Sequence, residues 1–242
     1  MKAKSEYDQE LLSKAMRCTG RICKIEHQGR AFWVKRKEVL SLRFRLQKGS
    51  PSKKFELERS VLHRLAGVHA YIPRIVAEGS DFFVLPDYGP SLQSILRAGN
   101  GESAAEKARA FADGATALAD LHAHGLSHGR PSLKDICWRD GQATLIDFEN
   151  HRDVLNSPYG QARDVISFFF NGLYVAGKPV PELETARDVY RARDVNGVWQ
   201  SAQKLVRRMR WVDWLTKPIQ MRRPGKAREF KTIPLTLAWF SA

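Results

Sequence analysis

The sequence predicts an α+β fold in which a small strand-rich region, residues 1–86, precedes a mostly helical region, residues 87–242. Between residues 16 and 86, short apolar runs such as "RICKIEH", "RAFWVKR" and "DFFVLPD" are broken by glycine and polar residues, which is typical of strands and turns. From about residue 92 onward, apolar residues recur at spacings of three and four, which is typical of amphipathic helices. The segment "LPDYGP" links the two regions.

We expect one main helix among the strands, at residues 52–66, because its apolar residues share one stripe and Gly67 follows it. This stripe consists of Phe55, Val61, Leu62 and Leu65. The clearest helix of the second region lies in "SAAEKARAFADGATALADLHAHG", and Gly125 ends it. Its stripe consists of Ala108, Phe111, Ala115, Leu118 and Leu121. Both stripes predict core positions.

The composition indicates a globular chain of 242 residues, of which 43% are hydrophobic. Such a chain is long enough for one sizeable core or for two small lobes. It contains no run of about 18 apolar residues, which argues against a transmembrane helix. Its first residues, "MKAKSEYDQELL", lack the apolar segment of a secretion signal. We therefore expect a cytoplasmic protein, with a peripheral position on the inner membrane as a further option.

The three cysteines, Cys18, Cys23 and Cys137, are odd in number and show no paired C-x-x-C spacing. This pattern argues against a zinc site and against a disulfide framework. We expect reduced, partly buried thiols.

The charge balance predicts an anionic partner or an anionic environment. The chain has 40 Lys and Arg against 26 Asp and Glu, a formal net charge of +14. Nucleic acid, phospholipid headgroups and phosphorylated saccharides all fit this charge. The excess lies in the first 60 residues and between Lys204 and Lys231, where only Asp213 and Glu229 oppose it.

Two carboxylates in the second region form a candidate metal site. Asp135 follows His128 by seven residues, and the apolar run "ATLIDF" ends in Asp147 and Phe148 after a turn at "RDG". A strand, a turn and a second strand would bring both carboxylates to one end of a ribbon. Oxygen ligands of this kind suit Mg²⁺, which takes its remaining ligands from phosphate and water. The alternative is that Asp135 caps a turn and Asp147 caps the strand end.

Lys35 and Glu58 form a second candidate pair in the first region. Lys35 ends the apolar strand "AFWVKR", and Glu58 lies on the following helix. A strand lysine that contacts nucleotide phosphates needs a helix carboxylate to hold its ammonium group. Each residue taken alone is equally consistent with a solvated surface charge.

In this order, the motifs resemble those of a small atypical protein-kinase-like fold, closest to the Kdo/WaaP-type lipopolysaccharide kinases of Gram-negative bacteria. The resemblance covers roughly residues 20 to 175. It rests on "FWVKR", "FELERSVLHRL", "FFVLPDYGPSL", "LADLHAHGLSHG", "KDICW", "LIDFEN" and "ARDVISFF". It implies a bilobal fold, with a strand-rich N-lobe containing one main helix and a mostly helical C-lobe.

The resemblance implies ATP and Mg²⁺ as cofactors, bound in a cleft between the lobes. It implies that Lys35 and Glu58 form the ion pair that positions the phosphates. The hinge residues Asp87 and Tyr88 would contact adenine through backbone hydrogen bonds.

For the catalytic loop, the resemblance makes His128 the motif histidine and gives Asp135 and Asp147 the roles of metal ligands. Asp164 of "ARDVISFF" resembles the buried helix Asp that supports this loop. Only 17 positions separate Asp147 from Asp164, which is short for the peptide-docking segment of protein kinases. This spacing favours a saccharide or another small molecule as the acceptor.

The sequence departs from the family pattern most strongly at Arg130, which occupies the position of the catalytic Asp. A guanidinium group cannot accept a proton at neutral pH. Asp153, in the triplet His-Arg-Asp at 151–153, is a candidate replacement base. Arg130 is a candidate binding residue for an anionic acceptor. Glu149 replaces the Gly that usually follows Asp-Phe, and no glycine-rich loop precedes Lys35.

We therefore expect a kinase acting on lipopolysaccharide core or another lipid-linked saccharide. The alternatives are a nucleotide-binding pseudokinase that serves as a regulatory or interaction module, and a kinase of a protein or a soluble small molecule. Nucleic acid remains a residual partner class, because the basic surface would attract it.

The segment "QKLVRRMRWVDWLTKP" is a candidate membrane-surface helix. A helical stripe contains Leu205, Met209, Val212 and Leu215, with Trp211 and Trp214 beside it and arginines around the other side. We expect Pro218 to end this helix. The alternative is that the stripe packs into the helical lobe.

Overall fold

The computed structural model describes residues 6–38, 51–97, 103–223 and 225–241. The chain divides into two compact units. The first comprises Met1–Tyr88 together with Asp147–Asn150, and the second comprises Gly89–Ile146 together with His151–Ala242. The first unit thus takes up a short segment that the sequence analysis assigned to the second region.

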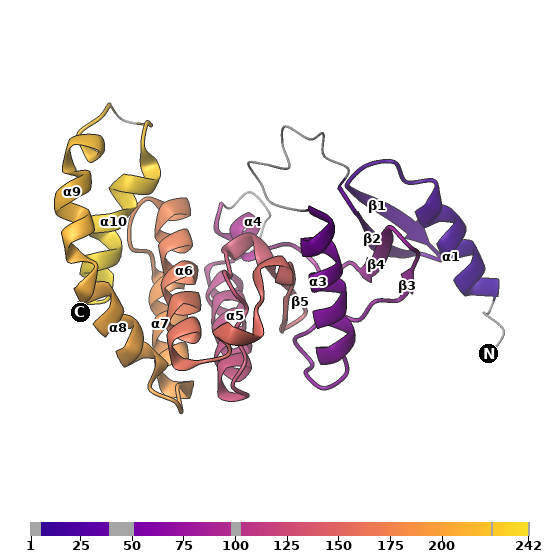
Figure 1. Cartoon of the computed structure of the whole chain (residues 1–242), viewed down its shortest axis with the longest axis horizontal. Coiled ribbons are helices and arrows are strands. Elements are labelled where there is room, and N and C mark those ends of the chain that lie inside the picture. The colour runs from indigo at the N-terminus through magenta and orange to yellow at the C-terminus, as the bar shows by residue number, and fades with distance from the viewer. Residues whose placement is uncertain (1–5, 39–50, 98–102, 224, 242) are drawn as a thin grey trace. The chain divides into compact units, whose positions relative to one another are not determined.

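An antiparallel sheet forms the first unit (Figure 1). Its strands are β1 (Ile22–His27), β2 (Arg30–Arg36), β3 (Ala77–Glu78) and β4 (Phe82–Pro86), in the order β1-β2-β4-β3. Gln28 and Gly29 connect β1 to β2 with positive φ angles of 47° and 72°. Two successive positive φ angles match the twist of a tight hairpin, so this turn fixes the register in which Ile22 pairs with Lys35.

A helix covers each face of this sheet. Helix α1 (Glu6–Met16) packs on one face through Leu11 and Ala15, which join a core of strand residues: Phe32, Val34, Phe82 and Val84. On the other face, Phe55 of helix α3 (Pro51–Leu65) stacks on Phe83 at a ring-centroid distance of 5.2 Å. Successive strand residues point to opposite faces, which explains the split. The helix predicted at 52–66 is α3, and α1 was not predicted.

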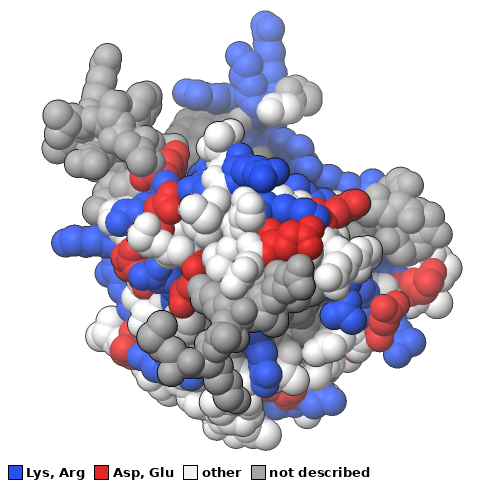
Figure 2. Space-filling model, turned by 90° about the vertical axis from the view of Figure 1, so that its right-hand side faces the viewer, with Lys and Arg blue, Asp and Glu red and all other residues white. Residues whose placement is uncertain are grey.

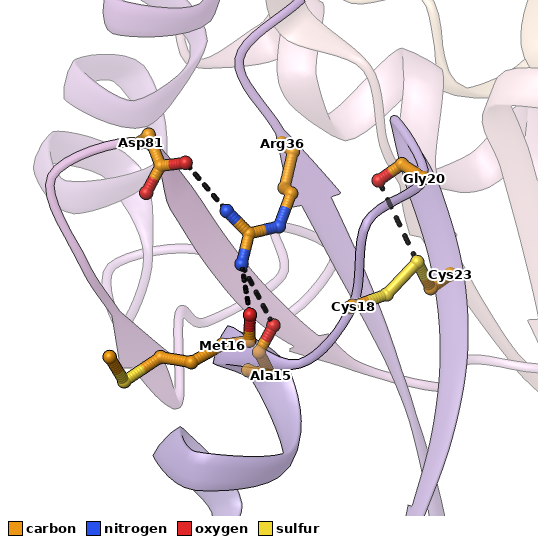
Figure 3. The surroundings of a disulfide bond; sticks show 7 residues. All are labelled: Ala15, Met16, Cys18, Gly20, Cys23, Arg36 and Asp81. Atoms are coloured by element: carbon orange, nitrogen blue, oxygen red, sulfur yellow. Dashed lines mark hydrogen bonds and ion pairs between the residues drawn. A yellow bond between two sulfur atoms is a disulfide. The ribbon is translucent and has the colours of Figure 1, made fainter.

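Cys18 and Cys23 form a disulfide, so the prediction of reduced thiols is wrong for these two residues (Figure 3). They lie on either side of the turn that leads from α1 into β1, with their Cα atoms 6.4 Å apart, within the usual range for a disulfide. The sulfur atom of Cys23 also lies 3.6 Å from the carbonyl oxygen of Gly20. Cys137 is a partly buried cysteine outside this disulfide, as expected.

The second unit contains helices α4 (Leu92–Leu96), α5 (Ala104–Ala123), α6 (Pro158–Ala176), α7 (Pro181–Arg193), α8 (Val198–Arg208), α9 (Arg210–Gln220) and α10 (Arg228–Trp239). A hairpin of β5 (Ile136–Arg139) and β6 (Gln142–Leu145) joins them. Helix α5 begins with a capping box between Ser103 and Glu106 and ends before Gly125, which has a φ of +74°. The predicted helix of this region is therefore present, with the predicted stop.

Aromatic side chains fill the core of the second unit. Phe169 contacts four other rings edge-on or tilted, with centroids 5.0 to 6.1 Å away, and these belong to Phe168, Trp199, Trp239 and Phe240. Phe111, Ala115, Leu118 and Leu121 of the predicted α5 stripe are completely buried, and Ala108 is half-buried. The aromatic contacts hold α6, α8 and α10 together, and α5 packs mainly on α7.

The basic C-terminal segment differs from its prediction. The helical conformation is interrupted at Met209, so α8 and α9 are separate helices. No single apolar stripe runs through both. Pro218 lies inside α9, which continues to Gln220. Pro218 has no N–H group to donate to the carbonyl four residues earlier, but the helix does not end there. No helix in the described part of the chain combines the length and apolarity needed to cross a bilayer.

Candidate functional site

The first unit brings Lys35, Glu58 and Asp147 together. The Nζ atom of Lys35 lies 2.5 Å from Oε2 of Glu58 and 2.7 Å from Oδ1 of Asp147. The Glu58 residue is only 1% exposed, whereas the Asp147 side chain is 26% exposed. One ammonium group thus bridges a buried carboxylate and a partly accessible one.

Local structure explains how these side chains meet. Lys35 pairs in register with Phe83, on the face of the sheet that α3 covers. Glu58 lies on α3 among the residues of its apolar stripe, which buries its carboxylate against the sheet. Asp147 adopts a left-handed backbone with φ of +66°, which aspartate tolerates better than most residues. The next residue, Phe148, is fully buried and anchors the short turn Phe148–Asn150 (η2) in the first unit.

Burial and charge shift the pKa values of this cluster. Burial lowers the pKa of Lys35, but attraction to Glu58 and Asp147 outweighs it, so the pKa is raised from the ordinary 10.5. Burial raises the pKa of Glu58 from 4.5 to about 7, against the opposing effect of Lys35. Burial is thus the main reason why Glu58 binds a proton readily, and the nearby negative charge of Asp147 adds to it.

Replacement of Glu58 by Gln should therefore change how stability depends on pH. Between pH 4.5 and 7 the native state holds a proton on Glu58 that the unfolded state has lost, so the stability of the wild type falls over this range. Between pH 4.5 and 7, we expect the free energy of unfolding of the wild type to fall by about 2–3 kcal/mol relative to that of Glu58→Gln. Urea unfolding at several pH values measures it.

The matched control is Glu56→Gln, because Glu56 lies on the same helix with a 41% exposed side chain. Its free energy of unfolding should differ from that of the wild type by no more than about 0.5 kcal/mol. If the Glu58→Gln difference instead shows the wild type gaining stability as pH rises, attraction to Lys35 dominates and the pKa of Glu58 is lowered.

Glu149, the residue at the usual Gly position, is held by cations of the first unit. Its carboxylate lies 3.4 Å from Nζ of Lys54 and 3.8 Å from the guanidinium of Arg21. Other basic residues of this unit are also paired, among them Lys24 with Asp87, Arg36 with Asp81 and Lys37 with Glu56. On the face shown in Figure 2, Lys and Arg are accordingly interspersed with Asp and Glu.

The second unit holds the predicted catalytic loop through Asp164. The backbone N–H of His128 donates to Oδ2 of Asp164 at 2.5 Å, and that of Gly129 donates to Oδ1 at 3.0 Å. Asp164 is completely buried. The ring nitrogen Nε2 of His128 lies 2.9 Å from the carbonyl oxygen of Ile146. The loop is thus fixed at both its backbone and its histidine ring.

Asp135 is held at the end of the β5–β6 hairpin. Its Oδ2 accepts hydrogen bonds from the backbone N–H and the hydroxyl of Ser132, at 3.1 and 2.6 Å. Its carbonyl oxygen accepts from the N–H of Ile146, the residue before Asp147. Asp140 and Gly141, with φ angles of 50° and 80°, form the predicted turn of this hairpin.

Arg130 and Asp153 are both accessible in the second unit. Arg130 is exposed and forms no ion pair with any described residue. The Asp153 side chain is 69% exposed, with Oδ1 lying 3.3 Å from Nε2 of His151. His151 is buried, and its Nδ1 lies 2.7 Å from the carbonyl oxygen of Ser127. The triplet at 151–153 is therefore tied to the residue that precedes His128.

The hinge residues Asp87 and Tyr88 make contacts within the first unit. The backbone N–H of Asp87 donates to the carbonyl oxygen of Ala31 at 3.0 Å, so this donor is already used in a hydrogen bond to strand β2. The Asp87 carboxylate lies 2.9 Å from Nζ of Lys24. The Tyr88 hydroxyl accepts from the N–H of Arg74, and burial raises the pKa of Tyr88.

Asp147 in the first unit and Asp135 in the second each carry carboxylate oxygens, the ligand type that Mg²⁺ prefers. Within the described residues, no cluster of three or more His, Cys, Asp or Glu side chains has the arrangement of a metal site. Mg²⁺ typically takes only one or two protein carboxylates and completes its shell with phosphate and water. Asp147, which is partly accessible, and Asp135 have the oxygen ligands that this chemistry needs.

Sequence reasoning missed several residues that support the loop. The side-chain oxygen of Asn171 accepts from the N–H of Leu133 at 2.9 Å. His122 lies 3.5 Å from Asp164, and its Nδ1 lies 2.6 Å from the Tyr190 hydroxyl. The sequence indicates part of this arrangement, because a polar His122 on the apolar side of α5 needs a buried hydrogen-bond partner.

A cavity of about 490 Å³ in the first unit is separate from these residues. It is lined by Met16, Cys18, Thr19, Arg21, Arg36, Lys37, Glu38 and Asp81. Arg36 follows Lys35 directly and therefore points to the opposite face of the strand. Its guanidinium donates hydrogen bonds to Asp81 and to the carbonyl oxygens of Ala15 and Met16 (Figure 3), so the charge of Arg36 is already paired.

Comparison with solved structures identifies the fold. The chain matches a structure of WbdD in complex with the kinase inhibitor LY294002, with a TM-score of 0.50 and 15% identity over 93% of this chain. A structure of the bifunctional kinase-methyltransferase WbdD matches over 72% of this chain with a TM-score of 0.47 and 15% identity. The chain spans only 43% and 42% of those two chains. The first match confirms the predicted α+β, protein-kinase-like fold.

Comparison with sequences identifies the family. No protein-family model matches the chain. An uncharacterized protein of Haemophilus influenzae is 30% identical over 217 residues, which cover 89% of this chain and 88% of that protein. The chain therefore belongs to the same family as this Haemophilus influenzae protein, and it has a protein-kinase-like fold.

Proposed function

We propose that the chain is an ATP- and Mg²⁺-dependent phosphotransferase that phosphorylates a hydroxyl group of a membrane-linked saccharide, either lipopolysaccharide core or another lipid-linked sugar. The observation that carries this proposal is the cluster of Lys35, Glu58 and Asp147. A kinase-like fold without nucleotide chemistry has no need to bury a lysine between two carboxylates, because burial of charge is costly.

In this proposal, Lys35 contacts the nucleotide phosphates and Glu58 holds its ammonium group in place. Asp147 and Asp135 would hold Mg²⁺, which would neutralise phosphate charge. Asp164 positions the loop that carries Arg130 by fixing the backbone of His128 and Gly129. The protein's own contribution is positioning and charge stabilisation, which matter most in phosphoryl transfer.

An anionic, sugar-bearing acceptor fits two further features. Arg130 is exposed at the position that would face an acceptor in a kinase, and a guanidinium group binds phosphate or carboxylate through two hydrogen bonds. The net charge of +14 favours association with such a substrate. WbdD, which shares the fold, is described as a bifunctional kinase-methyltransferase.

The test is transfer of the γ-phosphate of labelled ATP to dephosphorylated lipopolysaccharide core in the presence of Mg²⁺. We expect label in the saccharide with the wild-type chain and none with Asp147→Asn. Asp81→Asn, a carboxylate variant outside the cluster, should transfer label at the wild-type rate. If no acceptor becomes labelled although ATP binds, the phosphotransferase proposal is wrong and the pseudokinase alternative stands.

Arg130 is the observation that favours this second candidate, a nucleotide-binding pseudokinase that acts as an interaction module. The residue cannot serve as a base. The loss of a general base typically slows a reaction by about 10²–10⁴-fold, which reduces but does not abolish phosphoryl transfer.

Variants at Arg130 and Asp153 separate their two roles. Arg130→Ala should raise the KM for the acceptor about tenfold or more and leave the affinity for ATP unchanged, because it removes ground-state binding. Asp153→Asn should lower kcat if Asp153 is the substitute base. The matched control is Arg193→Ala, an exposed residue of α7. Steady-state kinetics with both substrates measures these effects. If both variants keep the wild-type KM and kcat, neither residue has the proposed role.

A further inference from the structure

Helix α9 presents apolar side chains to solvent. Its packed face contacts α10 and contains the buried Thr216, with Val212 and Ile219 half-buried beside it. On the opposite face, Trp211 is 62% exposed and Trp214 is 74% exposed. The outer face of α9 comprises Trp211, Trp214, Leu215, Pro218 and, just after the helix, Met221. Residues at these spacings share one side of a helix.

Exposed cations lie on α9 and in the residues just before and after it. The exposed basic residues on and beside α9 are Arg207, Arg208, Arg210, Lys217, Arg222 and Arg223. None of them forms an ion pair with a described carboxylate, in contrast to the paired cations of the first unit. The acidic residue of α9, Asp213, is half-buried, and its Oδ1 accepts a hydrogen bond from Gln220. These cations are therefore not paired with carboxylates among the described residues.

We propose that the outer face of α9 docks the chain on an anionic lipid bilayer. Tryptophan is the residue type that favours the boundary between headgroups and acyl chains, and basic side chains around an apolar helix face pair with anionic headgroups. A second copy of the chain fits poorly, because each copy would bring the same cations to the contact. Nucleic acid would engage the cations but offers nothing to Leu215 or Met221.

The expected strength is that of a reversible surface interaction. Each Lys or Arg near an anionic bilayer strengthens binding by about fivefold. The exposed apolar side chains add affinity in proportion to the area that they bury in the interface. The proposal does not rest on the proposed phosphotransferase activity, so Asp147→Asn should bind vesicles as the wild type does.

Co-sedimentation of the full chain with vesicles tests the proposal. We expect binding to vesicles of phosphatidylcholine with 30% phosphatidylglycerol, and much weaker binding to pure phosphatidylcholine or at high salt. Trp211→Ala combined with Trp214→Ala should weaken binding by about tenfold or more. Arg208→Gln combined with Arg210→Gln should weaken it by about thirtyfold.

Two controls match these variants. Lys178→Gln combined with Arg193→Gln makes the same change in net charge at exposed positions outside α9, and Val68→Ser removes an exposed apolar side chain of the first unit. Both should bind as the wild type does. Equal binding to neutral and anionic vesicles, no binding to either, or equal losses in the control variants would overturn the proposal. A wild-type dimer in light scattering that becomes a monomer in the double Trp variant would also overturn it, since a second copy would then occupy this face.

Discussion

Lys35→Ala and Asp147→Asn should each abolish the gain in stability that ATP and Mg²⁺ give the wild-type chain. A ligand that binds only the native state, at about 100 times its dissociation constant, adds about 2.7 kcal/mol to the free energy of unfolding. We expect the wild type to gain about this much. The variants should gain almost nothing, because under the proposed function they remove the cation that would contact the phosphates and the carboxylate that would hold the metal.

Thermal unfolding with and without ligand measures this gain within each variant, so changes in the stability of the free protein cancel. Lys37→Ala and Asp81→Asn are the matched controls, since both residues form ion pairs nearby, with Glu56 and Arg36, outside the cluster. They should keep the full gain. A wild-type gain that persists in Asp147→Asn would show that the nucleotide binds elsewhere.

Asp164→Ala should destabilise the chain by about 3–5 kcal/mol, the largest effect on stability that we expect from a polar residue. Asp164 is completely buried and accepts the backbone N–H groups of His128 and Gly129. Removal of one partner from such a buried arrangement leaves donors without an acceptor. Urea unfolding measures the loss.

Asp164→Asn keeps one acceptor oxygen and should cost clearly less than the alanine variant. The control is Asp188→Ala on α7, whose side chain is 65% exposed and whose loss should change stability by no more than about 0.5 kcal/mol. Equal, small losses for Asp164→Ala and Asp188→Ala would show that the loop does not depend on Asp164.

The features that the sequence predicted well depend on local chemistry. The α3 stripe, the glycine after α5 and the turn at Asp140 and Gly141 each follow from periodicity or from the backbone freedom of a few residues. Lys35 and Glu58 were predicted as a pair because the chemistry of a phosphate-binding lysine requires a carboxylate on the next helix. The structure places them 2.5 Å apart.

The features that the sequence did not predict depend on tertiary contacts. Helix α1 was not predicted, because its short apolar stripe indicates a packed helix only once the sheet that it covers is known. The disulfide of Cys18 and Cys23 needs the turn after α1 to bring two cysteines together. The break at Met209 separates α8, which packs through Val206, from α9, which packs through Thr216, and no residue in the local sequence marks this change.

Chemical labelling of Lys35 tests most directly whether the cluster of Lys35, Glu58 and Asp147 binds nucleotide phosphates. An acyl phosphate of ATP reacts with a lysine amine that is held beside its phosphates, because proximity raises the effective concentration. Mass spectrometry of the digested chain then identifies the modified lysine. We predict acylation of Lys35 that excess ATP with Mg²⁺ suppresses, whereas an unmodified Lys35, or a suppressible label on another lysine such as Lys54, would contradict the assignment.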